Sequence, residues 1–253
     1  MKVYQICFSP TGGVQKAADQ LSAALGAPVE KIDLTDRQLD FSSFSFDRDA
    51  LAVLAVPSYG GRVPALAAAR IAALRADGTP AVLLCVYGNR AFEDTLVELE
   101  DLADAAGFCP VAGVAAIAEH SIARQFASGR PDAQDCAKLR EDAAQILAKL
   151  ASKDNAAPAL PGNRPYKPLG SGVMVPQAGD GCVRCGLCAA RCPAGAIPTE
   201  DPSSTDATRC IGCMRCISVC PQGVRALAPG MLERVSGMLA KVCSARREGE
   251  LFL

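Results

Sequence analysis

The chain has 253 residues with 26 basic and 27 acidic side chains, and this near-neutral balance without a long basic block argues against nucleic-acid binding. Half of the residues are hydrophobic and 21% are charged, which is typical of globular proteins and excludes a disordered or fibrous chain. No uncharged run reaches the roughly 18 residues that a membrane span requires, and the N-terminus lacks the pattern of a signal peptide, so we expect a cytoplasmic protein.

The first 150 or so residues alternate between strand and helix patterns. Five segments are predicted strands: 2–8, 28–34, 50–57, 81–88 and 109–118. Four segments are predicted helices: 13–25, 64–75, 91–106 and 132–152. Strands that alternate with helices at this spacing indicate right-handed βαβ units, so residues 1–152 are predicted to form an α/β domain with a doubly wound five-stranded parallel sheet.

The composition changes after this domain. Residues 153–179 carry many Pro and Gly residues and no periodicity, so we predict a linker. An extended linker of this kind spans about 3.1 Å per residue and reaches almost any part of the first domain. Residues 180–229 form a cysteine-rich module, and residues 230–253 are predicted to be a C-terminal helix and a charged tail.

Thirteen cysteines are unusual for a chain of this kind. Eight of them lie between Cys182 and Cys220, in two copies of the pattern C-x2-C-x2-C-x3-C-P that are offset by 28 residues. This spacing is the one that holds cubane iron–sulfur clusters: three cysteines bind one cluster, and the cysteine before Pro binds the other. We therefore assign two 4Fe-4S ligand sets: Cys182, Cys185, Cys188 and Cys220, and Cys210, Cys213, Cys216 and Cys192.

Two other uses of these cysteines are less favoured. Zinc also binds four cysteines, but structural zinc sites usually come as two separated C-x2-C pairs. The odd total and the length of the chain argue against a disulfide framework. The scattered cysteines are expected to be small buried hydrophobic residues: Cys7, Cys85, Cys109, Cys136 and Cys243.

The cysteine-rich module resembles bacterial-type ferredoxins with two 4Fe-4S clusters, over about 45 residues and with all eight ligands present. The resemblance implies a small α+β fold. Residues 180–228 depart from many such ferredoxins in charge, because they carry five arginines against four acidic residues. We expect this positive charge to favour the reduced clusters and a redox partner protein with an acidic docking face.

Three segments follow predicted strands at the edge where doubly wound sheets bind ligands. The first combines hydroxyls and backbone amides before a helix, which suits a phosphate group: Ser9, Pro10, Thr11, Gly12, Gly13 and Val14. The other two place an aromatic ring beside glycine, which suits stacking on a planar ligand: Pro57, Ser58, Tyr59, Gly60, Gly61 and Arg62, and Tyr87, Gly88 and Asn89.

Together these segments resemble flavodoxin over about 150 residues. The resemblance implies FMN, with its phosphate in the first loop and its ring between the other two. The first loop departs from the usual S/T-x-T-G-x-T pattern at Pro10 and Val14, and because the chain has no Trp, Tyr59 is the expected stacking residue. The single histidine, His120, is expected to be a hydrogen-bonded loop residue rather than a proton donor to a flavin.

The order of the two domains resembles that of flavodoxin–ferredoxin fusion proteins. We therefore expect an electron-transfer protein that passes electrons between two 4Fe-4S clusters and FMN and on to a redox partner. The alternatives are an FMN-dependent reductase of a small substrate and a flavin-free docking module that carries a ferredoxin. No catalytic residue is assigned, and no G-x-G-x-x-G motif for a second nucleotide follows a strand. The linker also permits a homodimer in which the ferredoxin of one chain faces the FMN of another.

Overall fold

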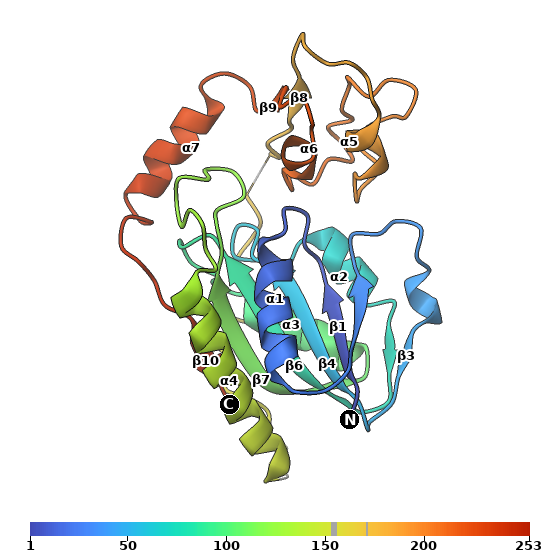
Figure 1. Ribbon diagram of the computed structural model, residues 1–253, viewed down its shortest axis with the longest axis vertical. Helices are drawn as coiled ribbons and strands as arrows, with labels where there is room; N and C mark the ends of the chain where they lie inside the picture. Colours follow the sequence, from blue (N-terminus) through green and yellow to red (C-terminus); the bar gives the residue numbers. More distant parts are fainter. Residues whose placement is uncertain (153–155, 171) are drawn as a thin grey trace.

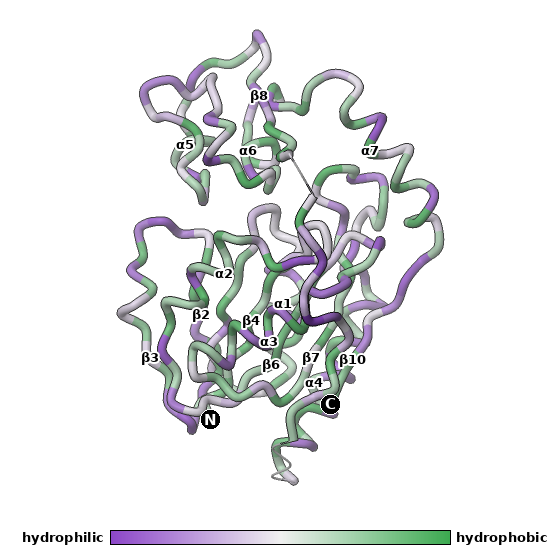
Figure 2. The backbone as a smooth tube through the Cα atoms, turned by 180° about the vertical axis from the view of Figure 1, so that it is seen from behind, coloured by the Kyte–Doolittle hydropathy of each residue, from purple (hydrophilic) through white to green (hydrophobic). Residues whose placement is uncertain are grey.

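The computed structural model describes residues 1–152, 156–170 and 172–253, so residues 153–155 and 171 of the predicted linker lie outside the described residues. A parallel sheet with helices on both faces occupies the first part of the chain (Figure 1). The cysteine-rich module lies beyond the carboxyl ends of the parallel strands, on the side opposite to both chain termini (Figures 1 and 2). None of the helices in the described ranges combines the length and apolar character needed to cross a membrane.

Five strands pair in parallel in the order β2-β1-β4-β6-β7. Their bounds are β1 (Val3–Cys7), β2 (Val29–Asp33), β4 (Leu51–Pro57), β6 (Thr79–Tyr87) and β7 (Phe108–Ile117). Every residue of β4 is buried because helices cover both faces of the sheet, which explains its continuous apolar sequence. This is the 2-1-3-4-5 order of flavodoxin-like domains, so the predicted fold class is confirmed.

Two pairs of helices enclose the sheet. The helices α1 (Gly13–Ala24) and α4 (Ala133–Ala151) bury their apolar side chains on one face, whereas α2 (Ala65–Ile71) and α3 (Thr95–Ala105) bury theirs on the other. The helix α2 ends before the predicted bound at residue 75, because Arg75 already pairs with Ser45 in a small second sheet. That sheet consists of β3 (Ser45–Phe46) and β5 (Arg75–Ala76), and the short 3-10 helix η1 (Phe41–Ser43) precedes it.

The cysteine-rich module repeats its structure as it repeats its sequence. The four-residue helices α5 (Leu187–Ala190) and α6 (Arg215–Ser218) are offset by the same 28 residues as the cysteine pattern. A left-handed residue precedes each of them, Gly186 at φ 76° and Met214 at φ 62°. The strands β8 (Gln177–Ala178) and β9 (Arg225–Ala226) pair and join the two ends of the module.

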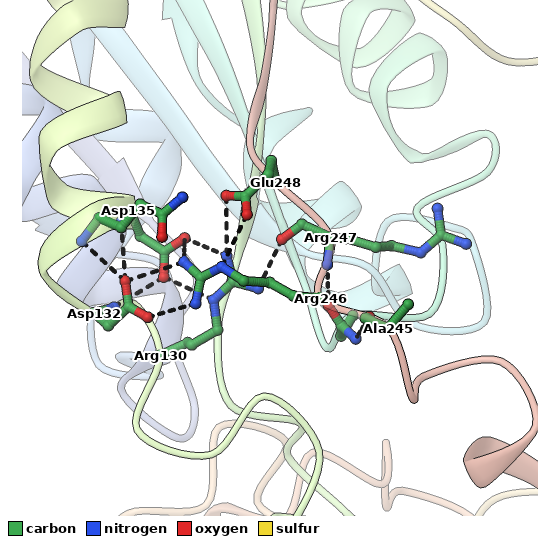
Figure 3. Close-up of polar contacts among 9 residues, drawn as sticks. Arg130, Asp132, Asp135, Ala245, Arg246, Arg247 and Glu248 are labelled. Atoms are coloured by element: carbon green, nitrogen blue, oxygen red, sulfur yellow. Dashed lines mark hydrogen bonds and ion pairs between the residues drawn. The ribbon is translucent and has the colours of Figure 1, made fainter.

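The C-terminal segment returns to the first domain. After the helix α7 (Met231–Ala240), the predicted tail forms a strand, β10 (Glu250–Phe252), which pairs antiparallel with β7 and adds a sixth strand to the sheet. The chain between them is held by ion pairs of Arg246 with Asp132 at 2.7 Å and with Glu248 at 2.9 Å (Figure 3). The sequence did not predict this strand.

Residues 163–167 of the linker are bound to α3 and to Asp94, the residue before it. The backbone N–H groups of Asn163 and Lys167 donate to the carboxylate of Asp94 at 2.8 and 2.7 Å, and Arg164 pairs with Asp101 at 2.7 Å. The cysteine-rich module is therefore attached to the first domain on both sides, by the linker before it and by the tail after it.

Candidate functional site

Each of two cavities in the module is lined by four cysteines. The structure groups them as follows: Cys182, Cys185, Cys188 and Cys220 around the first cavity, and Cys192, Cys210, Cys213 and Cys216 around the second. Each set takes three cysteines from one repeat and one from the other, as the spacing predicts. Among the described residues, no three His, Cys, Asp or Glu side chains are arranged to hold a single metal ion.

The sulfur atoms of the cysteines that precede Pro receive backbone hydrogen bonds. The N–H of Ala196 donates to Sγ of Cys192 at 3.3 Å, and in the second repeat backbone N–H groups from Gln222 to Arg225 lower the pKa of Cys220 against the effect of desolvation. Burial raises the pKa of Cys213 to about 12. The free thiol of Cys213 is thus protonated at neutral pH, and a metal that binds it must displace that proton.

Two buried arginine nitrogens next to the cavities have no hydrogen-bond partner among the residues that the structure describes. They are Nε of Arg225, which lines the first cavity, and Nε of Arg215, which lines the second. A guanidinium group keeps its charge in proteins, and a buried charge without a counter-charge is costly. The two cavities therefore fit a negatively charged occupant, as a cluster bound by four thiolates is.

A third cavity lies where β1, β4, β6 and β7 end. The predicted loops supply nine of its lining residues: Pro10, Thr11, Gly13, Val14, Pro57, Ser58, Tyr59, Tyr87 and Gly88. The rest of the lining is Val86 and the segment 118–121 that follows β7. The structure thus brings the three predicted loops to one place, at the edge of the sheet where doubly wound domains bind ligands.

Six predicted residues lie outside the lining of this cavity. Ser9 accepts a hydrogen bond from the N–H of Gln15 at 2.9 Å and so stabilises the start of α1, while Gly12 lines a neighbouring cavity. Gly60 and Gly61 form a turn with φ of 61° and 84°, and a side chain at Gly61 would overlap Glu93.

The remaining two of these six residues, Arg62 and Asn89, bind the segments that connect the domains. Arg62 pairs with Glu98 at 2.7 Å and donates to the carbonyl oxygen of Lys167 in the linker. The amide of Asn89 donates to the carbonyl oxygens of Cys243 and Ala245 in the tail, at 2.9 and 2.8 Å.

The segment 118–121 was not predicted as part of the site. It includes His120, whose Nδ1 accepts hydrogen bonds from the N–H groups of Ile122 and Ala123, so it is the hydrogen-bonded loop residue that the sequence predicts. Burial and the charge of Arg90 lower its pKa, so the ring is neutral and its proton lies on Nε2. Its position after the fifth strand, at the ligand-binding edge, was the available signal.

A fourth cavity, of about 350 Å³, lies between the first domain and the cysteine-rich module. It shares Thr11, Gly13, Glu119 and Ser121 with the third cavity, so the two cavities are neighbours. Its wall also includes three basic side chains and two residues of the module: Lys16, Arg124, Arg130, Met214 and Ser218.

The second cysteine set faces the first domain. Arg70 donates to the carbonyl oxygen of Pro193 at 2.9 Å, and Arg215 donates to the hydroxyl of Thr35. Met214 lines both the second cysteine cavity and the cavity between the domains. Burial raises the pKa of Tyr59 well above its usual value.

Residues 181–224 match the family model of the 4Fe-4S dicluster domain. The module is therefore a 4Fe-4S dicluster domain, and its eight cysteines provide for two clusters. Comparison with curated proteins gives no match.

Solved flavodoxins are similar to the first domain at low identity. The flavodoxin of Streptococcus pneumoniae TIGR4 is 18% identical, with 59% of this chain and 99% of that chain covered and a TM-score of 0.44. A flavodoxin from the domain Archaea is 11% identical (60% and 99% covered, TM-score 0.41), and that of Megasphaera elsdenii is 20% identical (56% and 98% covered, TM-score 0.36). We base the fold on the strand order, which is flavodoxin-like, and the chain is an electron-transfer protein by virtue of its dicluster domain.

Proposed function

We propose that the chain passes electrons between two 4Fe-4S clusters and FMN, and on to a redox partner protein. One observation carries this proposal: the cavity formed by the predicted flavin loops shares four lining residues with the cavity between the domains, and Met214 lines both that second cavity and the cavity of the second cysteine set. FMN accepts two electrons whereas each cluster carries one, so together they would connect one-electron and two-electron chemistry.

Different residues of the first domain would bind the phosphate and the ring of FMN. The backbone amides of Thr11, Gly12 and Gly13 at the start of α1 would bind the phosphate, because a helix N-terminus attracts anions. Lys16 would add positive charge from the neighbouring cavity wall, where Arg124 pairs with Glu119 at 2.5 Å. This charge would offset the hydroxyl that the flavodoxin loop pattern has at the position of Val14.

The flavin ring would lie near Tyr59. Tyr59 belongs to the loop after β4 and lines the third cavity, so a ring stacked on it would occupy that cavity. His120 would present its Nε2 proton as a hydrogen-bond donor from the loop after β7.

Electrons would enter or leave at the first cysteine set. Cys185 of this set is exposed, and Val183 beside it is 63% exposed. The exposed Arg184 and Arg191 give this surface a positive charge, which suits an acidic redox partner.

Anaerobic purification with counts of iron, sulfide and flavin tests the proposal. We expect about eight iron, eight sulfide and one FMN per chain. The variant Thr11→Asp places a carboxylate at the phosphate loop and should lose FMN but keep its iron, whereas the same change at the exposed Thr199 should keep both. Full iron without flavin, even after FMN is added, would reject the flavin part and favour a docking module.

An FMN-dependent reductase is the second candidate, because the cavity between the domains offers Lys16, Arg124 and Ser121 to a small anion. Turnover of a small acceptor by the FMN-loaded protein, lost in Arg124→Ala, would favour it. The arrangement of chains is tested separately: sedimentation velocity distinguishes a monomer, docked through the contacts described above, from a homodimer that exchanges its modules.

A further inference from the structure

The internal repeat of the dicluster domain is broken at a buried position. The offset of 28 residues that aligns all eight cysteines also aligns Ile197 with Arg225. Ile197 is 3% exposed and packs against Cys188 and Ala189 in the apolar centre of the domain. Arg225 is 2% exposed, so the second repeat buries a cation where the first buries a hydrocarbon.

Uncharged oxygens accept all the hydrogen bonds of Arg225 within the described residues. Its Nη1 donates to the hydroxyl of Thr205 at 2.9 Å and to the carbonyl oxygen of Pro176 at 3.4 Å. Its Nη2 donates to the carbonyl oxygens of Pro202 and Ser204, and no partner of its Nε is found in the described ranges. No carboxylate in the described part of the chain forms an ion pair with it.

Arg225 lies between the two ligand sets. It lines the cavity of the first set, next to Cys220. Its Nη1 donates to Thr205 and to the carbonyl oxygen of Pro176, and both of these residues line the cavity of the second set. The guanidinium group is therefore close enough to both sets to act electrostatically on each.

A buried guanidinium that is bound only by neutral oxygens needs a negative neighbour. It cannot lose its proton, and removing one partner of a buried charge pair typically destabilises a protein by several kcal/mol. Four thiolates around an iron–sulfur cluster carry a net negative charge, which increases when the cluster gains an electron. Arg225 therefore stabilises the occupied sites more than the empty ones, and the reduced state more than the oxidised one.

We propose that Arg225 is a shared counter-charge for the two cluster sites, which retains the clusters and raises their reduction potential. This inference rests on the iron–sulfur part of the proposed function and is independent of FMN. It makes Arg225 a positioning and tuning residue, since it acts through the cysteines and their ligand rather than by contact with a redox partner.

Four variants of the full-length protein, purified anaerobically, test it. Arg225→Ile restores the residue of the first repeat, Arg225→Gln keeps a hydrogen-bonding group without the charge, and Arg225→Lys keeps the charge. The matched control is Arg184→Gln, because Arg184 lines the same cavity but is exposed, so water screens its charge. Potentials are measured by redox titration with spectroscopic detection, in which dithionite supplies single electrons and is oxidised to sulfite.

We expect the loss of the buried charge to weaken reduction. In Arg225→Gln and Arg225→Ile the equilibrium constant for reduction of at least one cluster should fall by about tenfold, which is about 59 mV for one electron. Arg225→Lys should retain most of the wild-type potential, and Arg184→Gln should shift it much less than Arg225→Gln does. Release of iron to a chelator should be several-fold faster in Arg225→Gln than in Arg184→Gln.

The outcomes that would overturn the inference are distinct from a failure of the proposed function. Wild-type potentials and iron release in Arg225→Gln with its full iron content would remove the counter-charge role. An Arg225→Ile protein that loses its iron while Arg225→Gln behaves as wild type would show that only hydrogen bonding matters, and would also overturn it. A wild-type protein with eight iron and no flavin would reject FMN but leave this test unaffected.

Discussion

The parallel-sheet domain and the dicluster domain are held together by different means. The largest fully buried side chains of the described residues all lie between Ile6 and Leu99, in the sheet domain. Among the described residues of the dicluster domain, the apolar cluster has three buried members, Cys188, Ala189 and Ile197. The first domain thus folds by burying hydrocarbon, whereas the second depends on what its cysteines bind.

Removal of iron should give the largest contrast between them. Chelation should unfold residues 180–229, because the two cysteine sets then lose the ligand that joins them and Arg225 loses its counter-charge. The sheet should stay folded. Hydrogen exchange measured by mass spectrometry reports on both regions in one sample, and an iron-free dicluster domain with native protection would contradict this view.

A substitution that leaves a cavity in the core of the sheet domain should destabilise that domain and spare the dicluster domain. Leu54 in β4 is fully buried, so Leu54→Ala should lower the free energy of unfolding of the sheet domain by about 2–5 kcal/mol and leave the iron content unchanged. Urea unfolding followed by circular dichroism measures the first effect, and iron analysis the second. Leu39→Ala, at a side chain that is 37% exposed, is the control and should cost much less. Equal losses in the two variants would show that the sheet does not depend on its core as described.

A third prediction concerns the side chain of Asn89, through which the sheet domain holds the C-terminal tail. Asn89→Ala removes three hydrogen bonds to the segment 243–247, which should weaken docking of the tail by about 1–3 kcal/mol. Hydrogen exchange should rise in residues 243–252 and not in the linker. Asn163→Ala is the reciprocal control, since it should loosen the linker on α3 and leave the tail as it is.

The smallest of the four predicted effects is that of acid, which should weaken the docking of the linker on the sheet domain. Hydrogen bonds from the N–H groups of Lys167 and Asn163 lower the pKa of Asp94 below its usual 3.8. A lowered pKa contributes stability above the unfolded value, which is lost as pH falls below about 4 towards the folded value. Exchange in residues 160–167 should therefore rise, relative to its intrinsic rate, below pH 4. In Asp94→Asn it should already be high at neutral pH, and a linker equally protected in that variant would contradict this account.

Regular patterns made much of the structure predictable. Continuous apolar runs such as 51–57 identify buried parallel strands, and the cysteine spacing assigns each residue to one of the two cavities that the structure shows. The loops at strand ends were found because the carboxyl ends of parallel strands meet at one edge. In each case a local pattern carries the information.

The features that were not predicted depend on contacts between distant residues. The pairing of Arg164 with Asp101 joins positions 63 residues apart, and a stretch rich in Pro and Gly has no periodicity to reveal it. The strand β10 has three residues, too few for an alternation pattern, and forms because β7 offers it an edge. The burial of Arg225 could have been predicted from the sequence, because a comparison of the two repeats aligns it with the apolar Ile197.

The strand β10 also changes how the two domains meet. Because the chain leaves the sheet domain along α3 and returns to it at β7, the dicluster domain is a closed loop with two anchors. Encounter of the two halves is then intramolecular, at an effective concentration in the millimolar range for tethers of this kind. Under the proposed function, electron exchange between the clusters and FMN should therefore follow first-order kinetics, with a rate that dilution of the protein leaves unchanged.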